Sequence, residues 1–192
     1  IVELDFCVYE EVFKAHYYRK TRGLKCVPIS MNMSRIHLKS GNYIERFRAL
    51  ADKYQIDPGL IEVEVTETIF IENSGYVKRL VSALRSDGFK VSIDDFGSGY
   101  SSLNLLSEID VDVLKLDRSL CREENLSPKE RVILKNIAAM AKELDLQVLA
   151  EGIETTGQAE FLKSIQCDSA QGFLFAKPMP MDEFFKKLDG EW

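Results

Sequence analysis

The stretch that decides the fold is Lys90-Val-Ser-Ile-Asp-Asp95, followed by Phe96-Gly-Ser-Gly-Tyr-Ser-Ser102. Its first part is typical of an apolar strand that ends in two carboxylates. Its second part is a glycine-rich turn, after which residues 101–106 are predicted to form a short helix. The same succession of strand, polar end and helix recurs along the chain. Such alternation predicts a parallel sheet with helices packed outside it.

Six strand–helix units follow from this pattern. Strands are predicted over 25–32, 60–66, 90–95, 111–117, 147–151 and 169–175, and helices over 3–20, 40–54, 73–87, 101–106, 128–144, 155–165 and 180–188. An open doubly wound sheet usually has a glycine-rich phosphate loop after its first strand, and this chain has none there. A closed barrel has eight units and about 250 residues. We therefore expect one α/β domain over residues 1–192, a TIM-type (β/α) barrel that is N-terminally incomplete, with about six of eight units.

Composition excludes several classes of protein. The chain has 25 Lys and Arg against 31 Asp and Glu, for a net charge of -6, which disfavours DNA, RNA and anionic lipid as bulk partners. It contains neither a membrane-length apolar run nor an opening signal peptide. Four scattered cysteines without a C-x-x-C pair indicate reduced thiols in a cytoplasmic protein. With only two histidines, any metal site is expected to use oxygen ligands.

Polar residues lie at the end of every predicted strand. They are Asn32; Glu64, Thr66 and Glu67; Asp94 and Asp95; Lys115 and Asp117; Glu151; and Gln171. A single carboxylate at a strand end is usually a solvated loop residue or a helix cap. In a parallel barrel, however, the carboxyl ends of all strands share one face, where active sites are built. Six polar ends therefore predict an active site on that face.

The first four of these side chains suit a divalent metal. Asn32, Glu64, Asp94 and Asp95 supply three carboxylates and an amide, and carboxylates packed together would repel one another without a cation. Oxygen ligands of this kind suit Mg²⁺ or Mn²⁺. Neighbouring residues point to opposite sides of a regular strand, but at a strand end both Asp94 and Asp95 can reach one site. Two ions about 3.5–4 Å apart suit phosphodiester hydrolysis, so we expect two.

The remaining polar ends suit catalysis. Lys115 is placed to stabilise an attacking hydroxide or the phosphate charge. Glu151 is a candidate metal ligand or proton acceptor, and Gln171 a candidate for orienting water or touching the substrate. The plainer interpretation of Lys115 is a structural ion pair with Asp117.

With these residues in place, the chain resembles the EAL domain family. The matching segments are Ser30-Met-Asn-Met-Ser34, Glu64-Val-Thr-Glu67, Asp94–Ser102, Leu114-Lys-Leu-Asp117, Ala150-Glu-Gly-Ile-Glu154 and Ala170-Gln-Gly-Phe-Leu-Phe175. The resemblance covers nearly all of the chain, and the ordered set is very specific. It implies hydrolysis of the bacterial second messenger cyclic di-GMP to the linear dinucleotide pGpG, and a barrel in which one strand is antiparallel.

The resemblance also implies roles for individual residues. The metal positions are Asn32, Glu64, Asp94 and Asp95, with Glu151 as a further metal or water ligand, Lys115 as the catalytic lysine and Gln171 as an active-site glutamine. Glu67 matches the residue that anchors the following loop, and we expect Thr66, Asp117 and Glu154 to support the site in the same way. The loop residues Phe96, Gly97, Ser98, Gly99 and Tyr100 are associated with dimerisation in the family. A homodimer and a parent protein with fused sensor or GGDEF-type domains are therefore expected.

One departure from the family is large. The Glu-Ala-Leu motif and the arginine after it, a metal ligand and a substrate contact in the family, have no counterpart here. The chain begins just after the position of that motif. The chain is therefore either a truncated or incomplete form of an active parent or a degenerate domain. The other family residues are intact, which favours truncation of an active parent, and that parent is compatible with a membrane anchor elsewhere. We expect low or no hydrolysis by this chain alone.

Two other functions are compatible with the sequence. One is a non-catalytic receptor for cyclic di-GMP, although a receptor does not need the metal-binding positions. The other is an unrelated metal-dependent barrel, such as an enolase-type lyase, which the Asp94–Ser102 segment disfavours.

Overall fold

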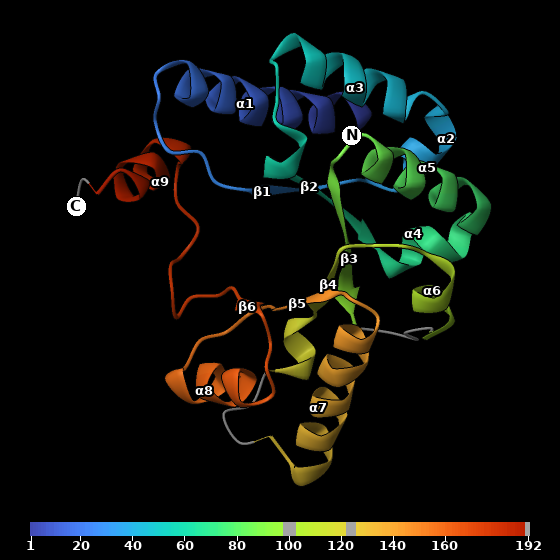
Figure 1. Cartoon of the computed structure of the whole chain (residues 1–192), viewed down its shortest axis with the longest axis vertical. Coiled ribbons are helices and arrows are strands. Elements are labelled where there is room, and N and C mark those ends of the chain that lie inside the picture. The colour runs from blue at the N-terminus through green and yellow to red at the C-terminus, as the bar shows by residue number, and fades with distance from the viewer. Residues whose placement is uncertain (98–102, 122–125, 191–192) are drawn as a thin grey trace. The chain divides into compact units, whose positions relative to one another are not determined.

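The computed structural model describes residues 1–97, 103–121 and 126–190. Its contacts divide the chain into two compact units, coloured along the sequence in Figure 1. The first unit comprises Ile1–Glu64, Gly75–Lys90 and Pro178–Trp192, and the second comprises Val65–Ser74 and Val91–Lys177. The expectation of one domain over the whole chain stays a prediction.

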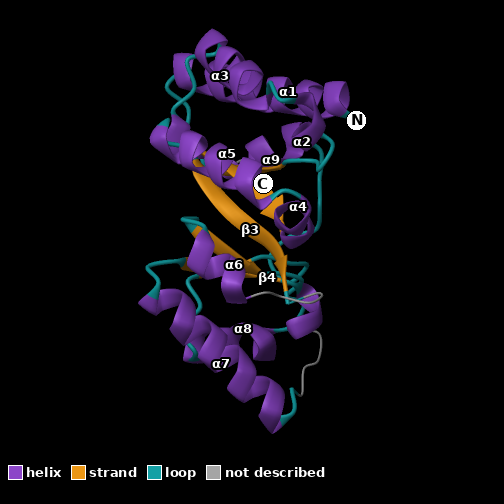
Figure 2. Ribbon diagram, turned by 90° about the vertical axis from the view of Figure 1, so that its right-hand side faces the viewer, coloured by secondary structure: helices purple, strands orange, loops and turns teal. Residues whose placement is uncertain are grey.

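The first unit packs helices on a short parallel pair of strands. Its elements are α1 (Val2–Thr21), β1 (Ile29–Asn32), α2 (His37–Ser40), α3 (Tyr43–Lys53), the 3-10 helix η1 (Pro58–Leu60), the start of β2 (Ile61–Thr66), most of α5 (Ser74–Ser86) and α9 (Met181–Leu188). Helices α1 and α3 lie side by side in both views (Figures 1 and 2). Aromatic rings fill the space between them: Tyr43 stacks on Phe47 with centroids 5.6 Å apart, and Phe47 meets Phe13 edge-on at 5.6 Å.

The second unit carries four strands that pair in parallel and in chain order. Its elements are the end of β2, α4 (Glu67–Glu72), β3 (Lys90–Phe96), α6 (Leu103–Glu108), β4 (Val113–Leu116), η2 (Arg118–Leu120), α7 (Pro128–Glu143), β5 (Gln147–Ala150), α8 (Thr156–Ser164) and β6 (Ser169–Ala170). The pairs are β3–β4, β4–β5 and β5–β6. Figure 2 shows α6, α7 and α8 beside these strands. Every residue of β4 is buried, as expected for a parallel strand covered on both faces.

Two helices of this unit begin with the same local device. In α7 the Ser127 hydroxyl accepts from the Glu130 amide and the Glu130 carboxylate accepts from the Ser127 amide. In α8 Thr155 and Gln158 form the corresponding capping box. These reciprocal bonds satisfy backbone donors that the first helical turn leaves open, and they fix where each chain segment enters its helix.

The predicted alternation of strands and helices is confirmed, and every strand pair described is parallel. Two strand boundaries were wrong, and one helix was missed. The first strand begins at Ile29, not at residue 25, and the last ends at Ala170, not at 175. Beyond it, the Phe175 amide donates to the Gly172 carbonyl, so this segment turns where the apolar residues had suggested a continued strand. Helix α4 was not predicted, because its sequence ETIFIE continues the apolar pattern of β2.

No helix in the described parts of the chain is long and apolar enough to cross a membrane.

Candidate functional site

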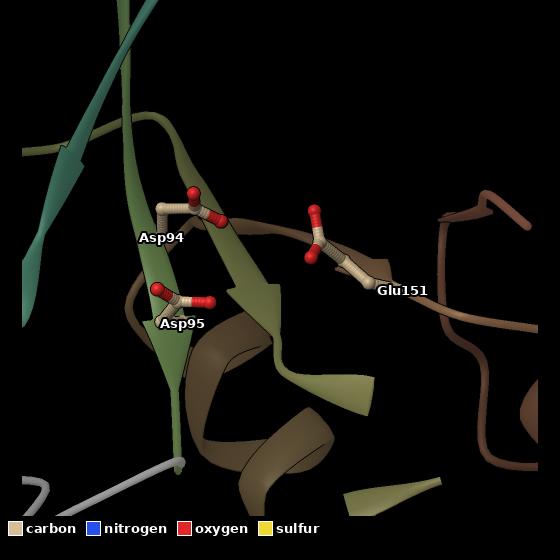
Figure 3. A group of neighbouring side chains, drawn as sticks. All are labelled: Asp94, Asp95 and Glu151. Atoms are coloured by element: carbon tan, nitrogen blue, oxygen red, sulfur yellow. The ribbon is translucent and has the colours of Figure 1, made fainter. Parts of the chain in front are cut away.

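Three carboxylates meet in the second unit. Asp94 and Asp95 lie near the end of β3, and Glu151 directly follows β5. One carboxylate oxygen from each residue lies within 4.8 Å of the other two. Figure 3 shows that the two aspartates project from one strand and that Glu151 faces them across a shared space. The structure thus brings together three of the residues predicted from the sequence to bind metal.

The backbone of β3 explains how adjacent aspartates reach the same space. Asp95 has φ of +58°, in the left-handed region, and the register between β3 and β4 shifts between Ile93 and Phe96. A regular strand would send successive side chains to opposite faces. The irregularity turns the second carboxylate back toward the first, and aspartate tolerates this conformation better than most residues.

A buried lysine lies between the carboxylates. The Lys115 side chain on β4 is 3% exposed, and its Nζ lies 3.0 Å from Asp94 Oδ1 and 2.7 Å from Glu151 Oε1. A buried ammonium is stable only when charged partners replace its water. Three carboxylates surround this one ammonium, so the group carries more negative charge than Lys115 can neutralise.

Gln171 orients Glu151 from the other side. Its Nε2 donates to Glu151 Oε1 at 2.8 Å. Its own backbone is fixed at both ends, because its amide donates to the Ala150 carbonyl and its carbonyl accepts from the Ile153 amide. The side-chain amide of Gln171 and the ammonium of Lys115 therefore both contact the same carboxylate oxygen of Glu151, Oε1.

The electrostatics of the cluster favour a bound cation. Burial raises the pKa of Glu151, Lys115 opposes that rise, and the charges of Asp94 and Asp95 add to it. Burial also raises the pKa of Asp95, together with the charges of Asp94 and Asp117. Both shifts mean that the carboxylates are costly to ionise where they lie. A divalent cation would remove that cost, and the all-oxygen donor set suits Mg²⁺ or Mn²⁺.

The supporting residues have more local roles. Asp117 caps η2 by accepting from the Ser119 amide at 2.9 Å. Thr66 precedes α4, and Glu67, which is 9% exposed, begins it. Glu154 is exposed, and its backbone amide donates to the Gln158 side chain.

Asn32 and Glu64 lie in the first unit. Asn32 ends β1 and is the register partner of Glu64 within β2, and Glu64 is 7% exposed. The Tyr9 hydroxyl donates to the Asn32 carbonyl at 2.7 Å, which fixes the end of β1 against α1. Tyr9 was missed from the sequence, where it reads as one apolar residue of a helix face.

Part of the predicted loop is described. Phe96 is 2% exposed and Gly97 follows it with φ of +92°. Ser98, Gly99 and Tyr100 lie outside the described residues.

Comparisons with known proteins identify the family of this chain. A family model described as the EAL domain matches residues 1–178. Signaling protein YkoW of Bacillus subtilis (strain 168) is 38% identical over 184 residues, which are 96% of this chain and 23% of YkoW. Cyclic di-GMP phosphodiesterase NbdA of Pseudomonas aeruginosa is 35% identical over 167 residues, which are 85% of this chain and 21% of NbdA.

A solved structure described as PaMucR phosphodiesterase in complex with c-di-GMP matches with a TM-score of 0.88 at 30% identity, covering 96% of this chain and 74% of that one. The chain spans less than a quarter of the length of YkoW and of NbdA. Sequence and structure agree across nearly the whole of this chain, and it belongs to the EAL domain family.

Proposed function

We propose that this chain forms the catalytic region of a metal-dependent phosphodiesterase that hydrolyses cyclic di-GMP to linear pGpG. The observation that carries the proposal is the convergence of Asp94, Asp95 and Glu151 around buried Lys115. Relatives named or described as cyclic di-GMP phosphodiesterases support the choice of substrate.

Asp94, Asp95 and Glu151 would hold a divalent cation. The family resemblance adds Asn32 and Glu64 as proposed metal-binding residues, and we propose two ions because two suit phosphodiester hydrolysis. Bound there, Mg²⁺ or Mn²⁺ would supply Lewis-acid activation of water and neutralisation of phosphate charge. In the reaction, water adds to phosphorus and one phosphoester bond breaks.

Glu151 and Lys115 have separate roles in this scheme. Glu151 accepts a proton, and Lys115 supplies a positive charge. Glu151, whose pKa is raised by burial, is better suited than an ordinary carboxylate to take a proton from water. Lys115 keeps Glu151 and Asp94 in place and offers a positive charge toward the phosphate oxygens. Gln171 limits rotation of the Glu151 carboxylate by its hydrogen bond.

The test is titration calorimetry with cyclic di-GMP in Ca²⁺, which is chosen to suppress hydrolysis, followed by a turnover assay in Mg²⁺. Asp95→Asn is the informative variant, because asparagine also tolerates the left-handed backbone at this position but lacks the charge. Asp110→Asn, at an exposed position of the same unit, is the control.

We expect metal-dependent binding and weak turnover, since the Glu-Ala-Leu motif has no counterpart in this chain, and we expect Asp95→Asn to reduce both and Asp110→Asn to leave them unchanged. Tight binding without turnover in Mg²⁺ would instead favour a receptor. Absence of binding by the folded chain would refute the proposal for this chain.

We further propose a homodimer and, in a longer protein, a fused sensor or GGDEF-type cyclase domain. The second part is supported by the length of the relatives, of which the chain spans less than a quarter.

A further inference from the structure

Gln158 makes one hydrogen bond that its helix does not need. It is 7% exposed, and its Oε1 accepts from the amides of Glu154 at 2.8 Å and Thr155 at 2.9 Å. The bond to Thr155 belongs to the capping box of α8. Its Nε2, however, donates at 2.6 Å to the carbonyl of Cys121, which lies 37 residues earlier in the chain. No capping box requires a donor in this direction.

This bond joins the two segments that leave the catalytic strands. Cys121 is the C-cap of η2, a turn that begins at Arg118, three residues beyond Lys115. Glu154 lies three residues beyond Glu151 at the end of β5. One amide side chain therefore connects the loop after β4 to the loop after β5.

The same two loops also approach each other closely at Gly152 and Arg118. Gly152 has φ of +67°, and a Cβ at this position would lie 2.5 Å from Arg118 Cβ. The loops approach so closely that no side chain fits between them. A hydrogen bond from a buried amide across such a contact fixes their spacing, because loss of the donor would leave a buried carbonyl without its partner.

We infer that Gln158 is a positioning residue for the proposed hydrolysis, holding Glu151 at its working distance from Lys115. This inference rests on the proposed function. The Lys115 Nζ lies 2.7 Å from Glu151 Oε1. Lys115 is the last residue but one of β4, and Glu151 directly follows β5, so each lies just before one of the two loops that Gln158 joins. A displacement of about 1 Å in such a site lowers a rate by as much as about 100-fold.

The hydrogen bond from Gln158 Nε2 to the Cys121 carbonyl is the tether between the two loops. The variant Gln158→Glu removes this bond alone. A carboxylate can still accept from the amides of Glu154 and Thr155, as the Glu130 carboxylate accepts from the Ser127 amide, but it cannot donate to the Cys121 carbonyl. Glu130→Gln is the matched control, since it makes the reciprocal exchange in the capping box of exposed α7. Gln158→Met is measured as a second variant, because it removes every hydrogen bond of the side chain. It is needed if burial keeps the carboxyl of Gln158→Glu protonated, since a protonated carboxyl can still donate to the Cys121 carbonyl.

The assay is single-turnover hydrolysis in Mg²⁺ at pH 8, with hydrogen exchange of the amides in 118–121 and 152–155 and calorimetric Mn²⁺ affinity as readouts that do not depend on activity. Both Gln158 variants are expected to exchange faster in the two loops and to lose about tenfold or more in kcat, with KM within about threefold. Glu130→Gln is expected to stay within about twofold of the parent rate, because its cap keeps an accepting oxygen.

Faster loop exchange with kcat within twofold of the parent would overturn the inference, as would a loss of thermal stability alone. If the parent chain itself fails to hydrolyse cyclic di-GMP, the proposed function fails separately. The tether is then judged by Mn²⁺ affinity and exchange, and it is refuted if neither changes in the Gln158 variants.

Discussion

Replacing Lys115 with methionine tests the electrostatic basis of the site. The substitution keeps a long apolar stem and removes only the ammonium. In the parent chain that group lies 3.0 Å from Asp94 Oδ1 and 2.7 Å from Glu151 Oε1, and its side chain is 3% exposed. Methionine therefore fills the same space but leaves three carboxylates facing one another without a positive charge.

The expected loss in stability follows from these contacts. The two ion pairs of Lys115 stabilise the folded chain, and removing one partner of a buried ion pair costs about 3–5 kcal/mol. Burying the ammonium opposes this gain, and the Asp94 and Glu151 side chains, 12% and 17% exposed, keep some contact with water. We expect Lys115→Met to lower the free energy of unfolding by about 3 kcal/mol at pH 7 in EDTA.

The loss should depend on pH in one direction. The folded-state pKa of Glu151 is already raised, so its stability contribution is fully present below the unfolded pKa and is lost as pH rises through the folded pKa. Lys115 opposes this rise, and removing it moves the folded pKa further up. The loss of unfolding free energy in Lys115→Met should therefore be smaller near pH 4.5 than at pH 7. The lower pH is close to the ordinary pKa of a glutamate side chain, about 4.3.

Urea denaturation followed by circular dichroism at both pH values measures this deficit. Lys142→Met is the matched control, because Lys142 lies 3.6 Å from Asp168 with both side chains more than a third exposed. Such a surface pair contributes less than about 1 kcal/mol. The reasoning is refuted if Lys115→Met unfolds within 1 kcal/mol of the parent, or if its deficit is equal at both pH values.

Other substitutions test the backbone and the first unit. Gly172→Ala should cost about 2 kcal/mol or more in urea denaturation, because its Cβ would lie 2.2 Å from a backbone oxygen. Gly23→Ala should cost about 1 kcal/mol, since only its positive φ opposes a side chain. Arg19→Lys should cost about 1–2 kcal/mol by losing the paired bonds to Asp189. Because Arg19 lowers the folded pKa of Asp189, its contribution is present above the unfolded pKa and should fade in unfolding curves below about pH 4. Asp95→Asn should stabilise the metal-free protein at pH 7, measured in EDTA, because it removes a carboxylate whose pKa is raised by burial and by its neighbours.

The sequence predicted the parts of the fold that depend on periodicity. Buried strands such as β4 and capped helices such as α7 have patterns that do not require knowledge of distant neighbours. The end of β6 was wrong because Phe173 and Phe175 resemble strand residues, whereas the turn there is stabilised by hydrogen bonds to Gly172 and to the loop after β5. The bond from the Leu174 amide to the Ile153 carbonyl joins residues that are far apart in the sequence, so no local pattern reveals it.

The candidate site divides in the same way. Polar strand ends predicted which residues to examine, and the structure brings Asp94, Asp95, Lys115, Glu151 and Gln171 together. The left-handed backbone of Asp95 could not be read from a sequence that is equally compatible with a regular strand. Nor does the capping-box pattern that includes Gln158 indicate that its side-chain Nε2 donates to the carbonyl of Cys121. Both features depend on tertiary contacts, and the roles assigned to the site residues stay predictions until the variants are measured.

The conformation of Asp95 explains both why the metal-free site lowers the free energy of unfolding and why the site would bind a cation. Its left-handed backbone and its raised pKa both work against the folded protein, and the same backbone turn places its carboxylate beside Asp94 and Glu151. A cation held by these carboxylates would offset the repulsion and increase the free energy of unfolding, since it binds a group that exists only in the folded state. Local instability without metal and affinity for metal would then have one physical origin, the excess of carboxylates around Lys115.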